Sequence, residues 1–212
     1  FKQIKYDNKL PKPLNYNFLD INVIWEIDPL KYPKLSDVIL NIQNWDMATD
    51  SNSVGAANYA VLYYTLINNF KGIKHKKIFD KIEIIDLITH TKNHLLEHFG
   101  SVNIKLGDFQ KLVRGNKEIG IFGLPDVITA MKGTKYKDGK IKITHGESYI
   151  SLIKFKDDKV EIETIISYRA SDNRGSKHYN DQMDLYSKFK TKKMSLDKKE
   201  VYSKGVRVYN PE

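Results

Sequence analysis

Two apolar runs separated by a short polar turn constrain the fold of this chain more than any other feature. The runs cover residues 149–155 and 160–168, and both are rich in β-branched and aromatic side chains. Asp157, Asp158 and Lys159 between them are typical of a tight turn, so the sequence predicts a β-hairpin. Because apolar side chains lie on nearly both faces of each strand, we expect the hairpin to be covered on both faces and to carry the core of a layered fold.

Helical spacing of apolar residues dominates the first half of the chain. This spacing predicts helices over residues 35–45, 54–68 and 78–99, with Ser53 capping the second helix and Gly100 ending the third. The N-terminal segment is punctuated by prolines and is expected to be irregular, with one short strand over residues 20–27.

Shorter elements are expected in the second half of the chain. In order, they are a helix over 106–113, an extended segment over 119–123, a helix over 125–131, a hairpin over 133–142 with Asp138-Gly139 at its tip, helices over 179–190 and 196–203, and an extended piece over 206–209. Helices first and strands later indicate the α+β class. We expect a mostly helical outer segment, 1–105, and an α+β segment that contributes core strands, 106–212, together one fragment of a larger domain.

The amino-acid composition excludes some classes of function for this chain. The 212 residues carry a net charge of +9, but only four of the 35 basic residues are Arg, which favours a solvated Lys-rich surface over a nucleic-acid site. A non-catalytic Lys-rich binding module remains an alternative. The absence of cysteine excludes disulfides and thiolate chemistry. No apolar run approaches the roughly 20 residues of a membrane helix, and no cofactor motif is present.

Residues 94–98 match H-x-x-E-H, the inverted zinc-protease pattern. His94 and His98 lie one helical turn apart and could share a metal, with Glu97 as the base. The competing interpretation is an ordinary amphipathic helix near its C-terminus, where cations are favourable. Under that interpretation we expect no bound metal, partly exposed histidines, and burial of Leu95, Leu96 and Phe99.

Two further positions could carry chemistry. Glu147 stands at the mouth of the first apolar strand, where a carboxylate could orient a catalytic base; the alternative is a solvated or backbone-bonded acid in a turn. Ser148 lacks a G-x-S-x-G context, which excludes a nucleophile elbow. His178 precedes a helix that carries Asp181, and the two could form a dyad or belong to a packed structural loop.

Several motifs occur in a fixed order along the chain. They are Leu106-Gly107-Asp108-Phe109, Leu112-Val113-Arg114-Gly115, Gly123-Leu124-Pro125-Asp126-Val127, Gly146-Glu147-Ser148-Tyr149, Ser176-Lys177-His178-Tyr179-Asn180-Asp181-Gln182 and Arg207-Val208-Tyr209-Asn210-Pro211. In order and spacing the series resembles the C-terminal part of the β-chain of the penicillin acylase family. That family includes acyl-homoserine-lactone acylases and cephalosporin acylases. Residues 29–53 resemble the helical stretch that precedes this part.

The resemblance implies an N-terminal-nucleophile hydrolase with an αββα sandwich. Such a protein is matured by self-cleavage into α- and β-chains and is usually exported to the periplasm. A serine at the new N-terminus of the β-chain attacks an amide carbonyl, and its own α-amino group serves as the base. An asparagine side chain and backbone donors hold the oxyanion.

The chain departs from the family pattern at its first residue, which is Phe1. We therefore expect a processed or truncated piece that is inactive alone, with the nucleophile upstream. Its expected partners are the upstream β-chain and α-chain segments of one precursor and an amide substrate, with neither nucleic acid nor membrane. An exposed apolar face or edge of the hairpin would be filled by those segments or by a second copy. Some acylases pair a histidine with a late glutamate, and Glu147 is the candidate for that orienting acid.

Overall fold

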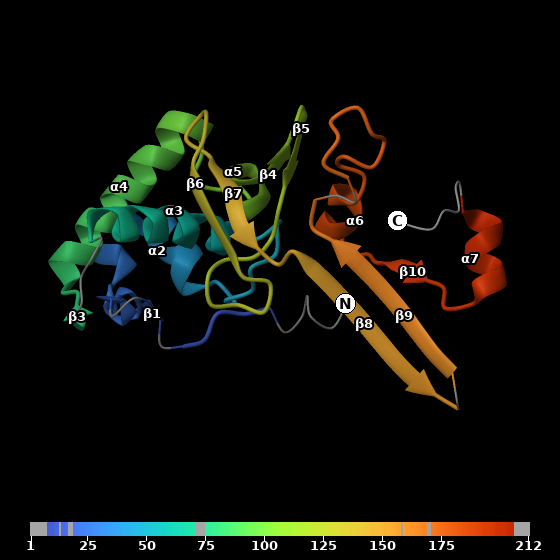
Figure 1. The fold of residues 1–212 in the computed structure, drawn as a ribbon. Coiled ribbons are helices and arrows are strands. Elements are labelled where there is room, and N and C mark those ends of the chain that lie inside the picture. Colours follow the sequence, from blue (N-terminus) through green and yellow to red (C-terminus); the bar gives the residue numbers. More distant parts are fainter. Residues whose placement is uncertain are drawn as a thin grey trace. The chain divides into compact units, whose positions relative to one another are not determined.

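A computed structural model describes residues 8–12, 14–16, 19–70, 75–157, 159–168 and 171–205. The chain forms two compact units that divide after Gly146. The larger unit lies within residues 2–146 and the smaller unit begins at Glu147. Helices and strands occur in both, so the α+β class is confirmed (Figure 1). The predicted division at residue 105 into an outer segment and a core-strand segment stays a prediction.

Three helices form the centre of the larger unit: α2 (Ser36–Gln43), α3 (Val54–Asn69) and α4 (Lys81–Phe99). The predicted helices are thereby confirmed, with ends shifted by a few residues. Helix α3 is buried on nearly every side, and Gly55 explains how closely it packs. A Cβ atom at Gly55 would lie 2.4 Å from Cβ of Trp45, so only glycine fits there. The hydrophobic cluster that these helices share is the main core of the chain.

The helix ends follow the predicted caps. The Ser53 hydroxyl accepts the Ala56 N–H at 3.1 Å, which begins α3. Asp80 and Glu83 form a capping box that begins α4 three residues later than the sequence suggested. Gly100 ends α4 with a left-handed φ of 69°.

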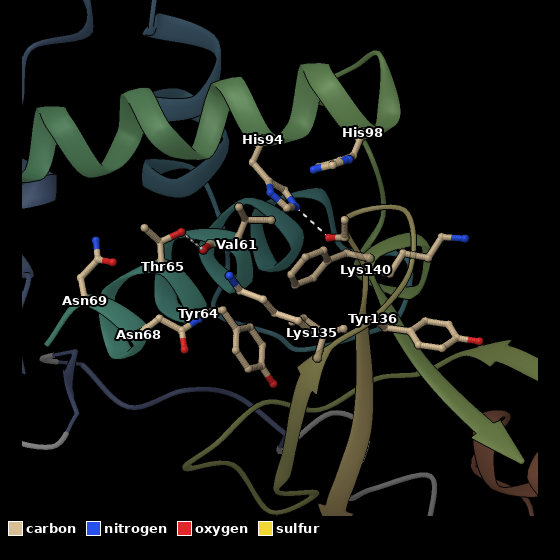
Figure 2. Close-up of a pocket in the computed structure, with 13 residues that line it drawn as sticks. Val61, Tyr64, Thr65, Asn68, Asn69, His94, His98, Lys135, Tyr136 and Lys140 are labelled. Carbon is tan, nitrogen blue, oxygen red and sulfur yellow. Dashed lines mark hydrogen bonds between the residues drawn. The ribbon is translucent and has the colours of Figure 1, made fainter. Parts of the chain in front are cut away.

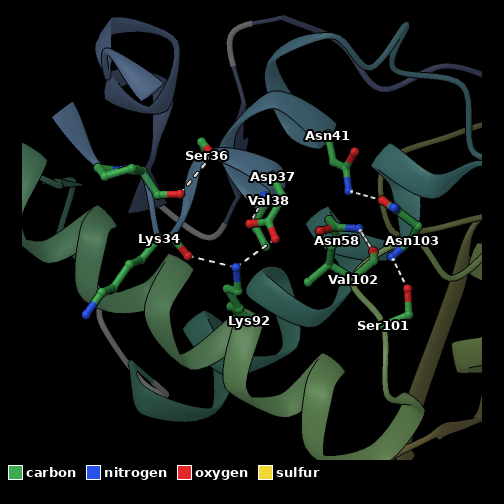
Figure 3. Close-up of polar contacts among 11 residues, drawn as sticks. Lys34, Ser36, Asp37, Val38, Asn41, Asn58, Lys92, Ser101, Val102 and Asn103 are labelled. Carbon is green, nitrogen blue, oxygen red and sulfur yellow. Dashed lines mark hydrogen bonds and ion pairs between the residues drawn. The ribbon is translucent and has the colours of Figure 1, made fainter. Parts of the chain in front are cut away.

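Polar contacts tie the helices together (Figure 3). The Lys92 ammonium on α4 lies 2.6 Å from the Asp37 carboxylate and donates to the Lys34 carbonyl at 2.7 Å. The buried Asn58 amide on α3 donates to the Val102 carbonyl at 2.9 Å. Each contact joins segments distant in sequence, so the helical packing is specific as well as apolar.

The predicted strand over residues 20–27 is wrong. Strands β1 (Asn15–Tyr16), β2 (Leu19–Asp20) and β3 (Lys77–Ile78) form a small sheet, and the chain then enters 3-10 helices η1 (Asn22–Glu26) and η2 (Pro29–Lys31). The physical reason is local. The Asp20 carboxylate accepts the backbone N–H of Asn22 at 3.1 Å, which turns the chain instead of extending it.

A four-stranded sheet of order β5-β4-β7-β6 completes the larger unit. Its strands are β4 (Gln110–Arg114), β5 (Lys117–Gly120), β6 (Met131–Lys135) and β7 (Ile141–Gly146), and the short helix α5 (Leu106–Phe109) precedes them. The predicted helix over 106–113 is correct only for its first turn, because the rest pairs with β5 and β7. The predicted helix over 125–131 is wrong, since this segment forms turns before β6. The predicted hairpin is confirmed, with positive φ at Asp138 and Gly139.

The smaller unit contains a three-stranded antiparallel sheet of order β10-β9-β8. Its elements are β8 (Tyr149–Lys156), β9 (Lys159–Ile166), α6 (Met183–Ser187), β10 (Lys192–Met194) and α7 (Lys198–Lys204). The hairpin is therefore confirmed, whereas the helix predicted over 179–190 is only five residues long. The extended piece predicted over 206–209 lies outside the described residues.

The two faces of this hairpin differ. Antiparallel pairing places Tyr149, Ile153 and Phe155 of β8 on one face, opposite Ile166, Ile162 and Val160 of β9. Ile153 is 53% exposed and Phe155 78% exposed. The expectation that the hairpin carries the core is wrong, because the main hydrophobic cluster lies in the larger unit.

Among the described residues, no helix has the length and apolar character that spanning a membrane requires.

Candidate functional site

Glu147 opens the smaller unit, two residues before β8 begins. Its side chain is half-buried, and its Oε2 atom accepts a hydrogen bond from the Tyr186 hydroxyl at 2.9 Å. This bond joins residues 39 positions apart in the sequence. The carboxylate is thus held by a specific partner and is more than a solvated acid in a turn.

Tyr186 lies on α6 and is completely buried. Burial raises the pKa of its phenol, and the nearby Glu147 carboxylate raises that pKa further. Tyr186 therefore stays protonated and acts as a hydrogen-bond donor across the physiological pH range. A buried donor of this kind fixes the position of the carboxylate that it serves.

Residues at the end of β9 also contact this site. The Ser167 hydroxyl donates to the backbone carbonyl of Glu147. The buried Gln182 side chain accepts the backbone N–H of Ile166 at 3.0 Å. Gln182 and Tyr186 are four residues apart, one turn of helix, so the same segment holds both the end of β9 and Glu147. We call Glu147, Ser167, Gln182 and Tyr186 the Glu147 cluster.

The sequence identified Glu147 but missed the residues that hold it. Tyr186 and Gln182 lie within the helix predicted over 179–190, and their spacing of four was the available signal. The predicted pair of His178 and Asp181 does form, with 2.8 Å between Nδ1 and Oδ2, at an exposed position.

The H-x-x-E-H segment lies on the last turns of α4. The rings of His94 and His98 are 4.5 Å apart, and His94 Nε2 lies 2.7 Å from the Gly139 carbonyl oxygen, to which it donates. Burial lowers the pKa of His94, which favours the neutral ring. Leu95 is buried, but Leu96 is 44% exposed and Phe99 is only partly buried, so the expected burial of Leu96 and Phe99 is wrong.

No group of three or more His, Asp or Glu side chains within the described ranges is arranged to hold a metal ion. One nitrogen of His94 is also committed to a backbone carbonyl. The described residues therefore lend no support to the zinc-protease interpretation.

Comparison with known proteins identifies one protein family and several relatives that match parts of this chain. A family model described as penicillin amidase matches residues 15–203. An acyl-homoserine lactone acylase PvdQ of Pseudomonas syringae pv. syringae (strain B728a) is 32% identical over 87 residues, which are 40% of this chain and 11% of that protein. PvdQ of Pseudomonas savastanoi pv. phaseolicola is 32% identical over 87 residues, with the same coverage. PvdQ of Pseudomonas fluorescens (strain Pf0-1) is 27% identical over 85 residues, 39% of this chain and 11% of that protein.

Proposed function

The chain belongs to the penicillin amidase family, and we propose that its 212 residues are part of an amide-hydrolysing acylase. The family match over residues 15–203 is the observation that carries this proposal. The 87 residues aligned with two of the PvdQ relatives cover only 11% of those proteins, so we propose that the activity belongs to a larger protein.

The relatives suggest the substrate class. Because three of them are named acyl-homoserine lactone acylases, we propose that the parent protein cleaves the amide bond of an N-acyl homoserine lactone. Such an activity would quench quorum signals. Cleavage of a penicillin side chain, with a consequence for antibiotic resistance, is the second substrate class that the family description suggests.

Within that protein, these residues would be scaffold. We propose that the nucleophilic serine and the oxyanion donors come from upstream segments of the same precursor, exported to the periplasm. Strands β8 and β9 would join an αββα sandwich there. The exposed side chains of Ile153 and Phe155 support this arrangement, because large apolar groups on one strand face are favourable only when another layer covers them.

Glu147 would act as a positioning residue. We propose that its carboxylate orients a histidine contributed by an upstream segment, so that the histidine presents the correct tautomer to the reacting groups. Support comes from the buried Tyr186 on α6, whose hydroxyl donates a 2.9 Å hydrogen bond to one oxygen of the Glu147 carboxylate.

The test uses the full-length precursor and the 212-residue chain in parallel. Each is incubated with an N-acyl homoserine lactone and a phenylacetyl amide, and release of free amine is measured. We expect turnover by the precursor and none above blank by the 212-residue chain, because the nucleophile is proposed to lie upstream. A precursor that hydrolyses no amide would refute the acylase proposal, and turnover by the short chain would refute the scaffold role.

A second experiment addresses Glu147 in the precursor. Glu147→Gln should lower kcat by at least about tenfold and alter the pH profile of kcat/KM, because the oriented histidine loses its partner. Tyr186→Phe should reproduce part of this effect. Glu161→Gln is the matched control, since that carboxylate is 67% exposed on the same hairpin. Unchanged kinetics and pH profile for Glu147→Gln would remove the positioning role but leave the acylase assignment intact.

A further inference from the structure

A cavity of about 350 Å³ lies within the larger unit, between helices α3 and α4 and the turn that joins β6 to β7 (Figure 2). This volume is within the range of small-molecule pockets. The cavity belongs to a different unit from the Glu147 cluster, so a ligand bound there is independent of the proposed function.

One part of the cavity wall is apolar and fixed. Val61, Tyr64, Phe109 and Ile141 are each at most 5% exposed and belong to the main core. The Tyr64 hydroxyl accepts the Gly133 N–H at 2.9 Å, which ties α3 to β6. A ligand with an apolar body would therefore find a preformed surface and would not need to order it.

The turn at Gly139 is held equally firmly against α4. Its carbonyl accepts the His94 hydrogen bond, and a Cβ atom at this glycine would lie 2.3 Å from Cδ2 of His98. The close contact leaves no room for a larger residue there. Both His94 and His98 line the cavity, and burial keeps the pKa of His94 low.

The side chains that line the cavity and can carry a charge near neutral pH are all basic. Lys135 and Lys140 line it together with the two histidines, and none of the described residues that line it is acidic. Lys140 is already paired with Glu118 at 3.5 Å. Lys135 makes no ion pair with a carboxylate in the described part of the chain, and Figure 2 shows its side chain extending from β6 toward α3. Lys135 is exposed to water at the mouth of the cavity, and a cation next to apolar side chains attracts an anionic ligand.

We propose that this cavity binds a small organic monocarboxylate with an aromatic or short aliphatic body. The body would pack against Val61, Tyr64 and Phe109, and the carboxylate would pair with Lys135. The C-terminal end of α3 is the negative end of a helix dipole, which places the carboxylate at Lys135 and away from Asn69. A divalent inorganic anion would gain the charge but not the apolar contact.

The test measures binding of 3-phenylpropanoate to the 212-residue chain by titration calorimetry and by the imidazole signals in NMR spectra. A ligand of this size should bind with a Kd of about a millimolar, and it should shift the His94 and His98 signals. Lys135→Met should weaken binding at least about tenfold. Lys132→Met is the matched control, because that lysine is exposed on the same strand and does not line the cavity. Thermal midpoints from Trp fluorescence verify that both variants are folded.

Two other probes make the result decisive. The uncharged 3-phenylpropanamide and inorganic phosphate should each bind at least about tenfold more weakly than the carboxylate, since each lacks one of the two interactions. Equal binding of the amide, equal binding of phosphate, or unchanged affinity in Lys135→Met would each overturn the proposal. Absence of any carboxylate binding up to about ten times the expected Kd would do the same.

Discussion

Replacing Ile153 by alanine tests whether the hairpin needs a layer from outside the chain. Ile153 is 53% exposed, whereas Ile165 on the opposite face of the same hairpin is fully buried. Truncating a fully buried Ile costs about 2–5 kcal/mol. A half-exposed Ile has left water only in part and leaves no closed cavity, so its loss should cost about 0.5–1.5 kcal/mol. Because both side chains belong to the same hairpin, differences in strand propensity largely cancel.

Hydrogen exchange of the backbone amides of β8 and β9 is the appropriate assay, because it reports the local stability of the hairpin. Each 1.4 kcal/mol is about a tenfold loss of protection. In the 212-residue chain, Ile165→Ala should reduce protection strongly and Ile153→Ala only slightly. In the full precursor the two losses should become similar, since the proposed second layer covers Ile153. An Ile153→Ala cost as large as that of Ile165→Ala in the short chain, or a cost that stays mild in the precursor, would exclude the covering layer.

Three further outcomes are expected in the larger unit, all measured by urea unfolding followed through Trp25 and Trp45 fluorescence. The pKa of His94 is lowered from 6.5, so the unfolded chain binds a proton that the folded chain does not. The free energy of unfolding should therefore fall as the pH falls through that value. His94→Gln should make the unfolding free energy depend less steeply on pH, and equal slopes in the two proteins would contradict the lowered pKa of His94. Gly55→Ala should cost at least about 1–3 kcal/mol, since the added methyl would lie 2.4 Å from Cβ of Trp45, and an unchanged midpoint would exclude this close packing. Asp80→Ala should cost about 1 kcal/mol through loss of the capping box, and no cost would show that α4 does not depend on its cap.

The helices of the larger unit could be predicted because their signals are local. Ser53 and Gly100 mark helix ends within one turn, and apolar residues recur at helical spacing along α2 and α4. The parallel pairing of β4 with β7 could not be predicted in the same way. Gln110 pairs with Ile141 in a parallel ladder, and its side-chain amide donates to the Gly123 carbonyl at 2.7 Å. These partners are 13 or more residues away, so helical spacing over 106–113 gave no sign of them.

The candidate site shows the same limit. Glu147 could be selected because it lies in a motif at the mouth of a strand. Its partner Tyr186 is 39 residues away and is brought close by α6 packing on β9. The spacing of Gln182 and Tyr186 indicates that they share a helix face, but it does not indicate what that face contacts.

The two faces of the hairpin differ in how far this chain covers them. On one face, Tyr149, Ile153 and Phe155 are all more than half exposed. On the opposite face the strand ends differ, because Ile165 is buried while Lys154 and Glu161 form an exposed ion pair at 3.3 Å. A hairpin buried on both faces would have no ion pair in this position. The proposed second layer would therefore cover only the face that carries Ile153, and the charged end of the other face would stay in water. The Ile153→Ala experiment tests the covered face.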